Sequence, residues 1–139
     1  MTTGFNTRSL HAGTEPDPST GARAPPIYQT SSYVFEDADT AADLYALQEE
    51  GDVYSRVSNP TVRQLEARLA DLEGGVGAVA TASGMGAFDA LTTVLAQSGD
   101  NIVASSDMYG GTGSYLSTLA PRRGIEARTV PTLEYDAYA

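Results

Sequence analysis

The stretch Val76 to Leu95, VGAVATASGMGAFDALTTVL, decides the fold. Residues 76–81 form a short apolar run that predicts a buried strand, and apolar residues at helical spacing from Phe88 to Leu95 predict a helix. Between them lies ASGMGA, residues 82–87, a turn of small residues. Strand, small-residue turn and helix together form a unit that directs free backbone N–H groups toward an anion.

The turn at residues 83–86 is therefore interpreted as a phosphate cradle. The first N–H groups of a helix lack partners within the helix, and the helix dipole is positive at that end. Residues without bulk let a phosphate group approach closely. The alternative is that these small residues serve only tight packing.

The following segment continues the alternation of strands and helices. Residues 102–104 and 125–130 are predicted strands, and Leu116 and Leu119 predict an intervening helix that Pro121 stops. Such an order implies a parallel sheet with right-handed crossovers. Ligands bind at the carboxyl ends of parallel strands, so the turn at residues 83–86 and the loop around Tyr109 are expected at one edge.

The N-terminal half begins with an arm. Residues 1–32 carry many turn formers and little periodicity, which predicts an extended segment. This arm is too apolar for a free tail, so we expect it to dock on the same domain or on a partner subunit; the apolar residues are Ile27, Tyr28, Tyr33, Val34 and Phe35.

Two helices are expected between the arm and the central stretch. Asp37 or Asp39 can cap a helix that runs to about Glu50. Asn59-Pro60 is a strong helix start, and Gly74-Gly75 ends that second helix.

The composition excludes several classes of function. The chain has 139 residues, 41% of them hydrophobic, and a net charge of −10 with arginine as its only basic residue besides one histidine. This charge argues against nucleic-acid and membrane partners. It favours adaptation to high salt, with the bias of a GC-rich genome as the alternative.

The absence of cysteine and the single histidine, His11, argue against a zinc site. No apolar run is long enough to span a membrane and the start lacks a signal-peptide pattern, so a cytoplasmic location is expected.

Two further groups of residues are candidate ligands of a flat, phosphorylated molecule. Arg56, in the sequence Tyr54-Ser55-Arg56, can hold a phosphate through fork-like hydrogen bonds. Tyr109, beside two glycines, can stack on a ring. Taken singly, each is better explained as a surface or packing residue.

Several segments occur together in a fixed order. They are SLHAG at 9–13, DPSTGA at 17–22, PPIYQTSSYVF at 25–35, YSRVSNPT at 54–61, LEARLADLEGG at 65–75, ASGM at 82–85, GDNIV at 99–103 and YGGT at 109–112. In this combination the chain resembles the pyridoxal 5′-phosphate (PLP) enzymes of cysteine and methionine metabolism. Within that family the sequence from Phe35 to Arg56 most resembles the O-acetylhomoserine sulfhydrylases, with cystathionine γ-synthase or γ-lyase as the alternative.

The resemblance implies an α/β fold of the aspartate aminotransferase type (fold type I). Residues 1–53 would be an N-terminal arm and helix that dock on a partner subunit. Residues 54–139 would be the first part of the PLP-binding large domain, with a mostly parallel but incomplete sheet.

The resemblance also implies roles for residues of the second half. Gly84 and Met85 would donate backbone N–H groups to the cofactor phosphate, and Ser83 would lead into that turn. Tyr109 would stack on the pyridine ring.

The residues of the first half would act across a subunit interface. Tyr54, Ser55 and Arg56 would reach the phosphate of the neighbouring subunit's cofactor in a homotetramer. Tyr54 would help in proton transfer, which makes it, with Tyr109, a candidate catalytic residue.

One departure from the family pattern is severe. PLP chemistry needs a lysine that binds the cofactor and moves protons, and the sequence contains none. We therefore expect the chain to be an N-terminal piece of such an enzyme, through truncation or a frameshift, and to be inactive alone. A non-catalytic remnant is the second hypothesis. An unrelated phosphate-binding module is the third, although no GxGxxG or GxxxxGK[ST] turn follows the first predicted strand.

Overall fold

The computed structural model describes residues 4–138, and its contacts divide the chain into two compact units, Met1–Ala80 and Thr81–Ala139. The expected division into an arm of residues 1–53 and a cofactor-binding part of residues 54–139 concerns domains of the family and stays a prediction. An α/β class with parallel strands is confirmed.

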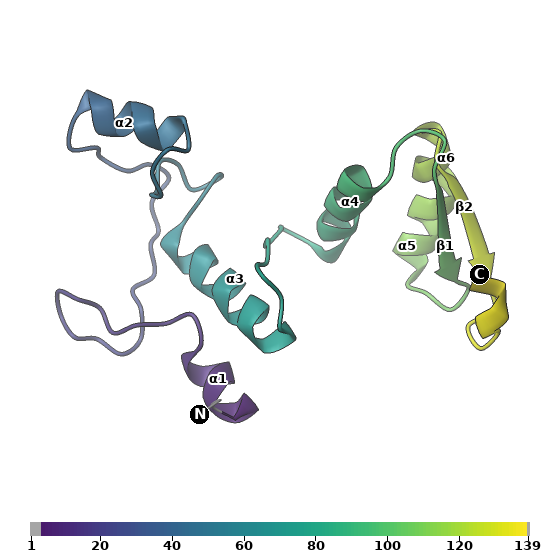
Figure 1. Ribbon diagram of the computed structural model, residues 1–139, viewed down its shortest axis with the longest axis horizontal. Coiled ribbons are helices and arrows are strands. Elements are labelled where there is room, and N and C mark those ends of the chain that lie inside the picture. Colours follow the sequence, from purple (N-terminus) through teal and green to yellow (C-terminus); the bar gives the residue numbers. More distant parts are fainter. Residues whose placement is uncertain (1–3, 139) are drawn as a thin grey trace. The chain divides into compact units, whose positions relative to one another are not determined.

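The first unit contains three helices, α1 (Phe5–His11), α2 (Ala38–Tyr45) and α3 (Pro60–Glu73) (Figure 1). Helix α1 packs on α3, so the N-terminal segment is not uniformly extended as expected. Arg8 forms an ion pair of 2.7 Å with Asp71 of α3. The Arg68 side chain donates a hydrogen bond of 3.0 Å to the carbonyl of Ala12. These contacts fix the arm on a helix of the same chain.

The helix starts follow the capping signals of the sequence. Asp37 caps α2, and its carboxylate accepts a hydrogen bond of 2.7 Å from Thr40 N–H. Asn59 caps α3, Pro60 is its first residue and Gly74 ends it with φ 69°. The expected extension of α2 to Glu50 is wrong, because Leu47 has a positive φ of 57° and turns the chain away.

The second unit begins with α4 (Gly84–Leu95) and continues with β1 (Asn101–Ser105). A continuous helical segment follows, made of α5 (Gly110–Ser114), the π-helix η1 (Tyr115–Leu119) and α6 (Ala120–Arg122). It leads to β2 (Glu126–Val130), and the 3₁₀ turn η2 (Tyr135–Tyr138) follows. Strands β1 and β2 pair in parallel, with Asn101 opposite Glu126 and Ser105 opposite Val130 (Figure 1).

The core of the second unit lies between the strands and the helical segment. Its buried members are Tyr115, Leu116, Ala120 and Ile125. Apolar residues of α4 and of both strands pack against them. The sequence predicts that Pro121 stops this helix, but in the structure Pro121 lies inside α6, after the π turn. A proline ring clashes with the carbonyl four residues earlier, and the wider π turn relieves that clash.

The strand expected at residues 76–81 is absent. Val79 is 84% exposed, and no strand among residues 4–138 pairs with this segment. The N–H of Ala80 instead donates to the carboxylate of Glu66 at 2.7 Å. An apolar segment becomes a strand only when a neighbouring strand forms hydrogen bonds with its backbone. The apolar composition of residues 76–81 was therefore not sufficient to predict a strand.

Candidate functional site

The first turn of α4 leaves two N–H groups free. Ser83 is the N-cap, and its hydroxyl accepts a hydrogen bond of 3.0 Å from Gly86 N–H. The Ser83 carbonyl accepts the N–H of Ala87 at 3.0 Å. Within residues 4–138, no hydrogen bond uses the N–H of Gly84 or Met85. The turn thus presents two unpaired donors at the positive end of a helix of 12 residues.

The space beside these donors is open. A Cβ added to Gly84 would meet no atom within 4 Å, and the first turn of α4 contains no acidic residue. An anion at this position would therefore neither clash with a side chain at Gly84 nor be repelled by a carboxylate of that turn.

Tyr109 belongs to the same unit as this turn. It precedes α5, and its side chain is 73% exposed. A Cβ on Gly111 would overlap the Tyr109 ring, so the ring lies directly against that glycine. The hydroxyl of Thr112 contacts the sulfur of Met85 at 3.9 Å, which joins the Tyr109 loop to the first turn of α4.

The loop before Tyr109 is tied down at the end of β1. Asp107 N–H donates to the Ser105 hydroxyl at 3.1 Å, and the Thr132 hydroxyl donates to the Asp107 carboxylate at 2.6 Å. Ser105 also shares a hydrogen bond with Thr132 at 2.5 Å. Tyr109 therefore follows the carboxyl end of β1 on a restrained loop, where ligands of parallel sheets are found.

Tyr54, Ser55 and Arg56 lie in the first unit. The guanidinium of Arg56 lies 5.4 Å from the centre of the Tyr54 ring, and both side chains are exposed. This arrangement presents a cation and a phenol together. Tyr54 forms an isolated antiparallel bridge with Ser32, and Ser55 N–H donates to the Ser31 carbonyl at 2.9 Å.

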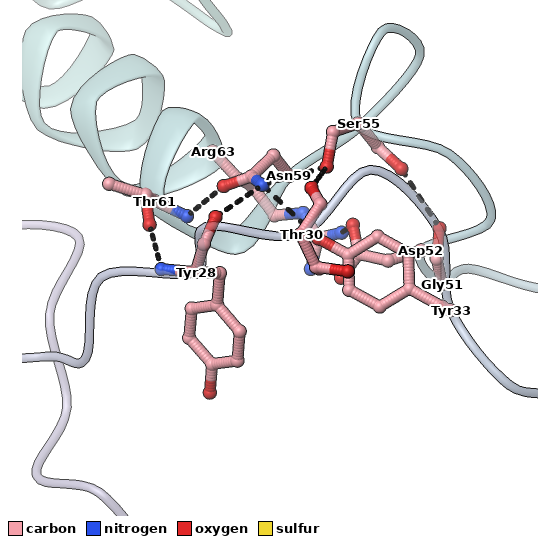
Figure 2. A network of polar contacts seen from close by, with 10 residues as sticks. Tyr28, Thr30, Tyr33, Gly51, Asp52, Ser55, Asn59, Thr61 and Arg63 are labelled. Atoms are coloured by element: carbon pink, nitrogen blue, oxygen red, sulfur yellow. Dashed lines mark hydrogen bonds and ion pairs between the residues drawn. The ribbon is translucent and has the colours of Figure 1, made fainter.

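A polar network behind this segment holds it in place (Figure 2). The Asn59 amide donates to the Tyr28 carbonyl at 3.0 Å, to the Tyr33 hydroxyl at 3.2 Å and to the Ser55 hydroxyl at 3.0 Å. The Ser55 hydroxyl in turn donates to the carbonyl of Thr30. Ser55 is thus engaged inside the network, whereas the side chains of Tyr54 and Arg56 are exposed.

Sequence reasoning did not single out a cluster of three residues near the first turn of α4. The Asp89 carboxylate accepts hydrogen bonds from the Tyr115 hydroxyl at 2.7 Å and forms an ion pair of 2.7 Å with Arg123. The hydrogen bond from Tyr115, and after it the one from Arg123, lower the pKa of Asp89. The signal in the sequence was the spacing of four residues between Met85 and Asp89, which places both on one face of the helix.

Other types of site find no support in residues 4–138. No group of three His, Cys, Asp or Glu side chains in this range could hold a metal ion. None of the described helices is long and apolar enough to cross a membrane.

Comparisons with known proteins agree with one another. A family model described as Cys/Met metabolism PLP-dependent enzyme matches residues 6–139. O-acetyl-L-homoserine sulfhydrylase 1 of Thermus thermophilus is 57% identical over 125 residues, which cover 89% of this chain and 30% of that protein. O-acetyl-L-homoserine sulfhydrylase of Leptospira meyeri is 52% identical over 124 residues, which cover 89% of this chain and 28% of that protein.

A crystal structure gives the same result. A putative O-acetylhomoserine (thiol)-lyase from Campylobacter jejuni matches with a TM-score of 0.90 and 40% identity, covering 99% of this chain and 34% of that chain. That crystal structure contains N′-pyridoxyl-lysine-5′-monophosphate. The chain thus spans about 30% of the length of the curated relatives it matches.

Proposed function

Because the chain belongs to the family of Cys/Met metabolism PLP-dependent enzymes, we propose that its residues form part of the PLP site of an O-acetylhomoserine sulfhydrylase. In that reaction sulfide replaces the acetoxy group of O-acetylhomoserine, which gives homocysteine and acetate for methionine biosynthesis. Among the matched crystal structures, the identity to the putative O-acetylhomoserine (thiol)-lyase, 40%, is higher than that to a cystathionine gamma synthase from Xanthomonas oryzae, 30%, which favours this substrate.

The observation that carries the proposal is the free first turn of α4. A phosphate bound there would accept hydrogen bonds from the N–H groups of Gly84 and Met85, which have no partner within residues 4–138. The Ser83 hydroxyl caps the helix by accepting from Gly86 N–H, which leaves its own O–H free to donate to the phosphate. The residues present therefore fit the phosphate group of PLP.

Tyr109 would bind the ring of the cofactor. Its exposed side chain lies against Gly111, and Thr112 of the same loop contacts Met85. Phosphate donors and an aromatic face are thus joined within one unit. When bound, PLP supplies an electron sink for the amino-acid substrate; the chain's own residues would hold and orient it.

Tyr54 and Arg56 would serve the cofactor of a neighbouring subunit in a homotetramer. The outward guanidinium of Arg56 suits a phosphate, and the Tyr54 hydroxyl would hold or move a proton at the substrate. Ser55 would contribute by fixing the backbone between them, since its hydroxyl is bonded to Thr30 and Asn59. The enzyme would act in the cytoplasm.

The 139 residues contain no lysine, so they do not provide the residue that holds PLP covalently. We expect no homocysteine when this chain alone is mixed with PLP, O-acetylhomoserine and sulfide. We expect homocysteine from a chimera in which it replaces the matching 30% of the Thermus thermophilus sulfhydrylase.

The decisive comparison uses two exposed tyrosines of this chimera. Tyr109→Ala should weaken PLP retention, whereas Tyr135→Ala, at a side chain with similar exposure of 75%, should not. Homocysteine formation by the isolated chain, or a folded chimera that retains PLP and is inactive, would contradict the proposal.

A further inference from the structure

We infer that Asp89, Tyr115 and Arg123 form a positioning cluster that sets the Tyr109 ring relative to the free N–H groups of Gly84 and Met85, so that one flat phosphorylated ligand contacts both. These three residues, the Asp89 cluster, are not among the residues proposed to contact the ligand. The inference rests on the proposed function, because it concerns how the same cofactor is held.

The cluster joins the two elements that carry the ligand contacts. Asp89 belongs to α4, one turn after Met85. Tyr115 belongs to the helical segment that begins directly after Tyr109, and Arg123 is the capping residue at the end of that segment. Because each side of the cluster is attached to one half of the proposed site, the separation of the two halves depends on the bonds within the cluster.

Those bonds converge on one hydroxyl. The Tyr115 hydroxyl donates to Asp89 at 2.7 Å, accepts from Arg123 at 2.8 Å and shares a hydrogen bond of 2.7 Å with Thr92. Tyr115 and Thr92 are 5% and 6% exposed. The ring of Tyr115 also packs edge-on against Phe88, with the ring centres 5.2 Å apart. A buried hydroxyl with three partners fixes the relative position of the two helices more narrowly than apolar packing does.

The π-helix η1 brings the cluster together. Tyr115 and Arg123 are eight positions apart. In an uninterrupted α-helix, residues at this spacing are rotated by about 80° around the axis. A π turn accommodates roughly one additional residue, which reduces the rotation to about 20°. The guanidinium of Arg123 accordingly lies 5.7 Å from the centre of the Tyr115 ring.

The ion pair between Asp89 and Arg123 contributes little to the stability of the fold. The side chains of Asp89 and Arg123 are 45% and 42% exposed, and exposed ion pairs contribute little to folding. Its geometry, however, orients the carboxylate that accepts from Tyr115. A functional site needs its groups held within about 0.5 Å of the productive geometry, which such supporting bonds supply.

The test compares two probes on the ¹⁵N-labelled chain. Inorganic phosphate reports only on the N–H groups of Gly84 and Met85. Pyridoxine 5′-phosphate, which has the ring but no aldehyde, reports on these groups and on stacking with Tyr109. Dissociation constants are measured from the amide shifts of Gly84 and Met85, and their ratio gives the preference for the ring-bearing probe.

The variants are Tyr115→Phe and Asp89→Asn, which keep the shape of the side chains, and Arg123→Gln with Arg122→Gln as its matched control. Arg122 is exposed and has no hydrogen bond within the described residues other than through its backbone. We expect the preference for pyridoxine 5′-phosphate to fall about threefold to tenfold in the three cluster variants, the size of one stacking contact. Phosphate affinity should stay within about twofold, and Arg122→Gln should keep both values.

The outcomes separate the inference from the proposed function. An unchanged preference, or a parallel loss of affinity for both probes, would overturn the positioning role. If neither probe shifts the amides of Gly84 and Met85 in the unmodified chain, the proposed phosphate site itself is wrong.

Discussion

The packing of the N-terminal arm on α3 requires glycine at position 13, because a side chain there would overlap the helix. Gly13 has a φ of 67°, and an added Cβ would lie 2.8 Å from the Cβ of Ala67 and 2.9 Å from the backbone nitrogen of Arg68. Gly13→Ala would cost about 1–2 kcal/mol for the left-handed conformation. Displacing a helix backbone adds about 1–3 kcal/mol, because neither contact is the mobile end of a side chain. We therefore expect the docking of α1 on α3 to weaken by at least about 2 kcal/mol.

Gly21→Ala is the matched control. Gly21 has a φ of 69° but nothing within 4 Å of an added Cβ, so it tests the conformational cost alone. Amide hydrogen exchange of residues 5–12 measures the docking, and a loss of 2 kcal/mol corresponds to exchange about thirtyfold faster. Gly21→Ala should leave exchange in these residues unchanged. Equal exchange in the Gly13→Ala variant and the unmodified chain would refute the reasoning that arm and helix meet at Gly13.

The remaining predictions address the caps, the Tyr109 loop and acid stability. Asn59→Ala should lower the unfolding free energy by about 1–3 kcal/mol, measured by urea unfolding, because it removes the cap of α3 and the donor to three part-buried acceptors, whereas Asn59→Ser should recover part of the loss by retaining a cap. Gly111→Ala should displace the Tyr109 ring, seen in its NMR shifts, with little loss of stability, since the ring is the mobile end of a side chain; Gly110→Ala, which meets no atom within 4 Å, should leave the ring in place. Hydrogen bonds from the side chains of Ser19 and Thr20 lower the pKa of Asp17 from 3.8 to about 2. A carboxyl whose pKa is lowered on folding contributes stability above its unfolded-state pKa, and this contribution is lost as the pH falls through its folded-state pKa. In the Asp17→Asn variant, the unfolding free energy should therefore lose the part of its pH dependence that Asp17 causes between about pH 4 and pH 2.

Local chemistry made the helix ends predictable. Asp37, the Asn59-Pro60 pair and Gly74 each act through atoms within a few residues of themselves, and each lies where the sequence placed it. The turn from Ser83 to Met85 belongs to the same class, because a serine cap and small residues determine its backbone without distant partners.

Features that depend on distant residues were not predictable. The docking of Gly13 on Ala67 joins residues far apart in sequence, and the arm therefore looked extended. The run at residues 76–81 was predicted to be a strand from its composition, yet pairing needs a neighbouring strand. The cluster around Asp89 also escaped notice, because a π turn changes the helical spacing on which sequence patterns are based.

The three described helices of eight residues or more show why only one first turn suits an anion. Helix α2 begins with the carboxylates of Asp37 and Asp39, which already offset the positive end of its dipole and would repel a phosphate. Helix α3 begins with Pro60, which has no N–H to donate, and Thr61 N–H is taken by the Asn59 side chain at 2.9 Å. Helix α4 alone combines an uncharged cap, no acidic residue in its first turn and two unpaired N–H groups. Stability would favour a carboxylate at this helix start as well, worth about 0.3–1 kcal/mol. The proposed phosphate site accounts for the absence of an acidic residue from this first turn in a chain that has 18 of them.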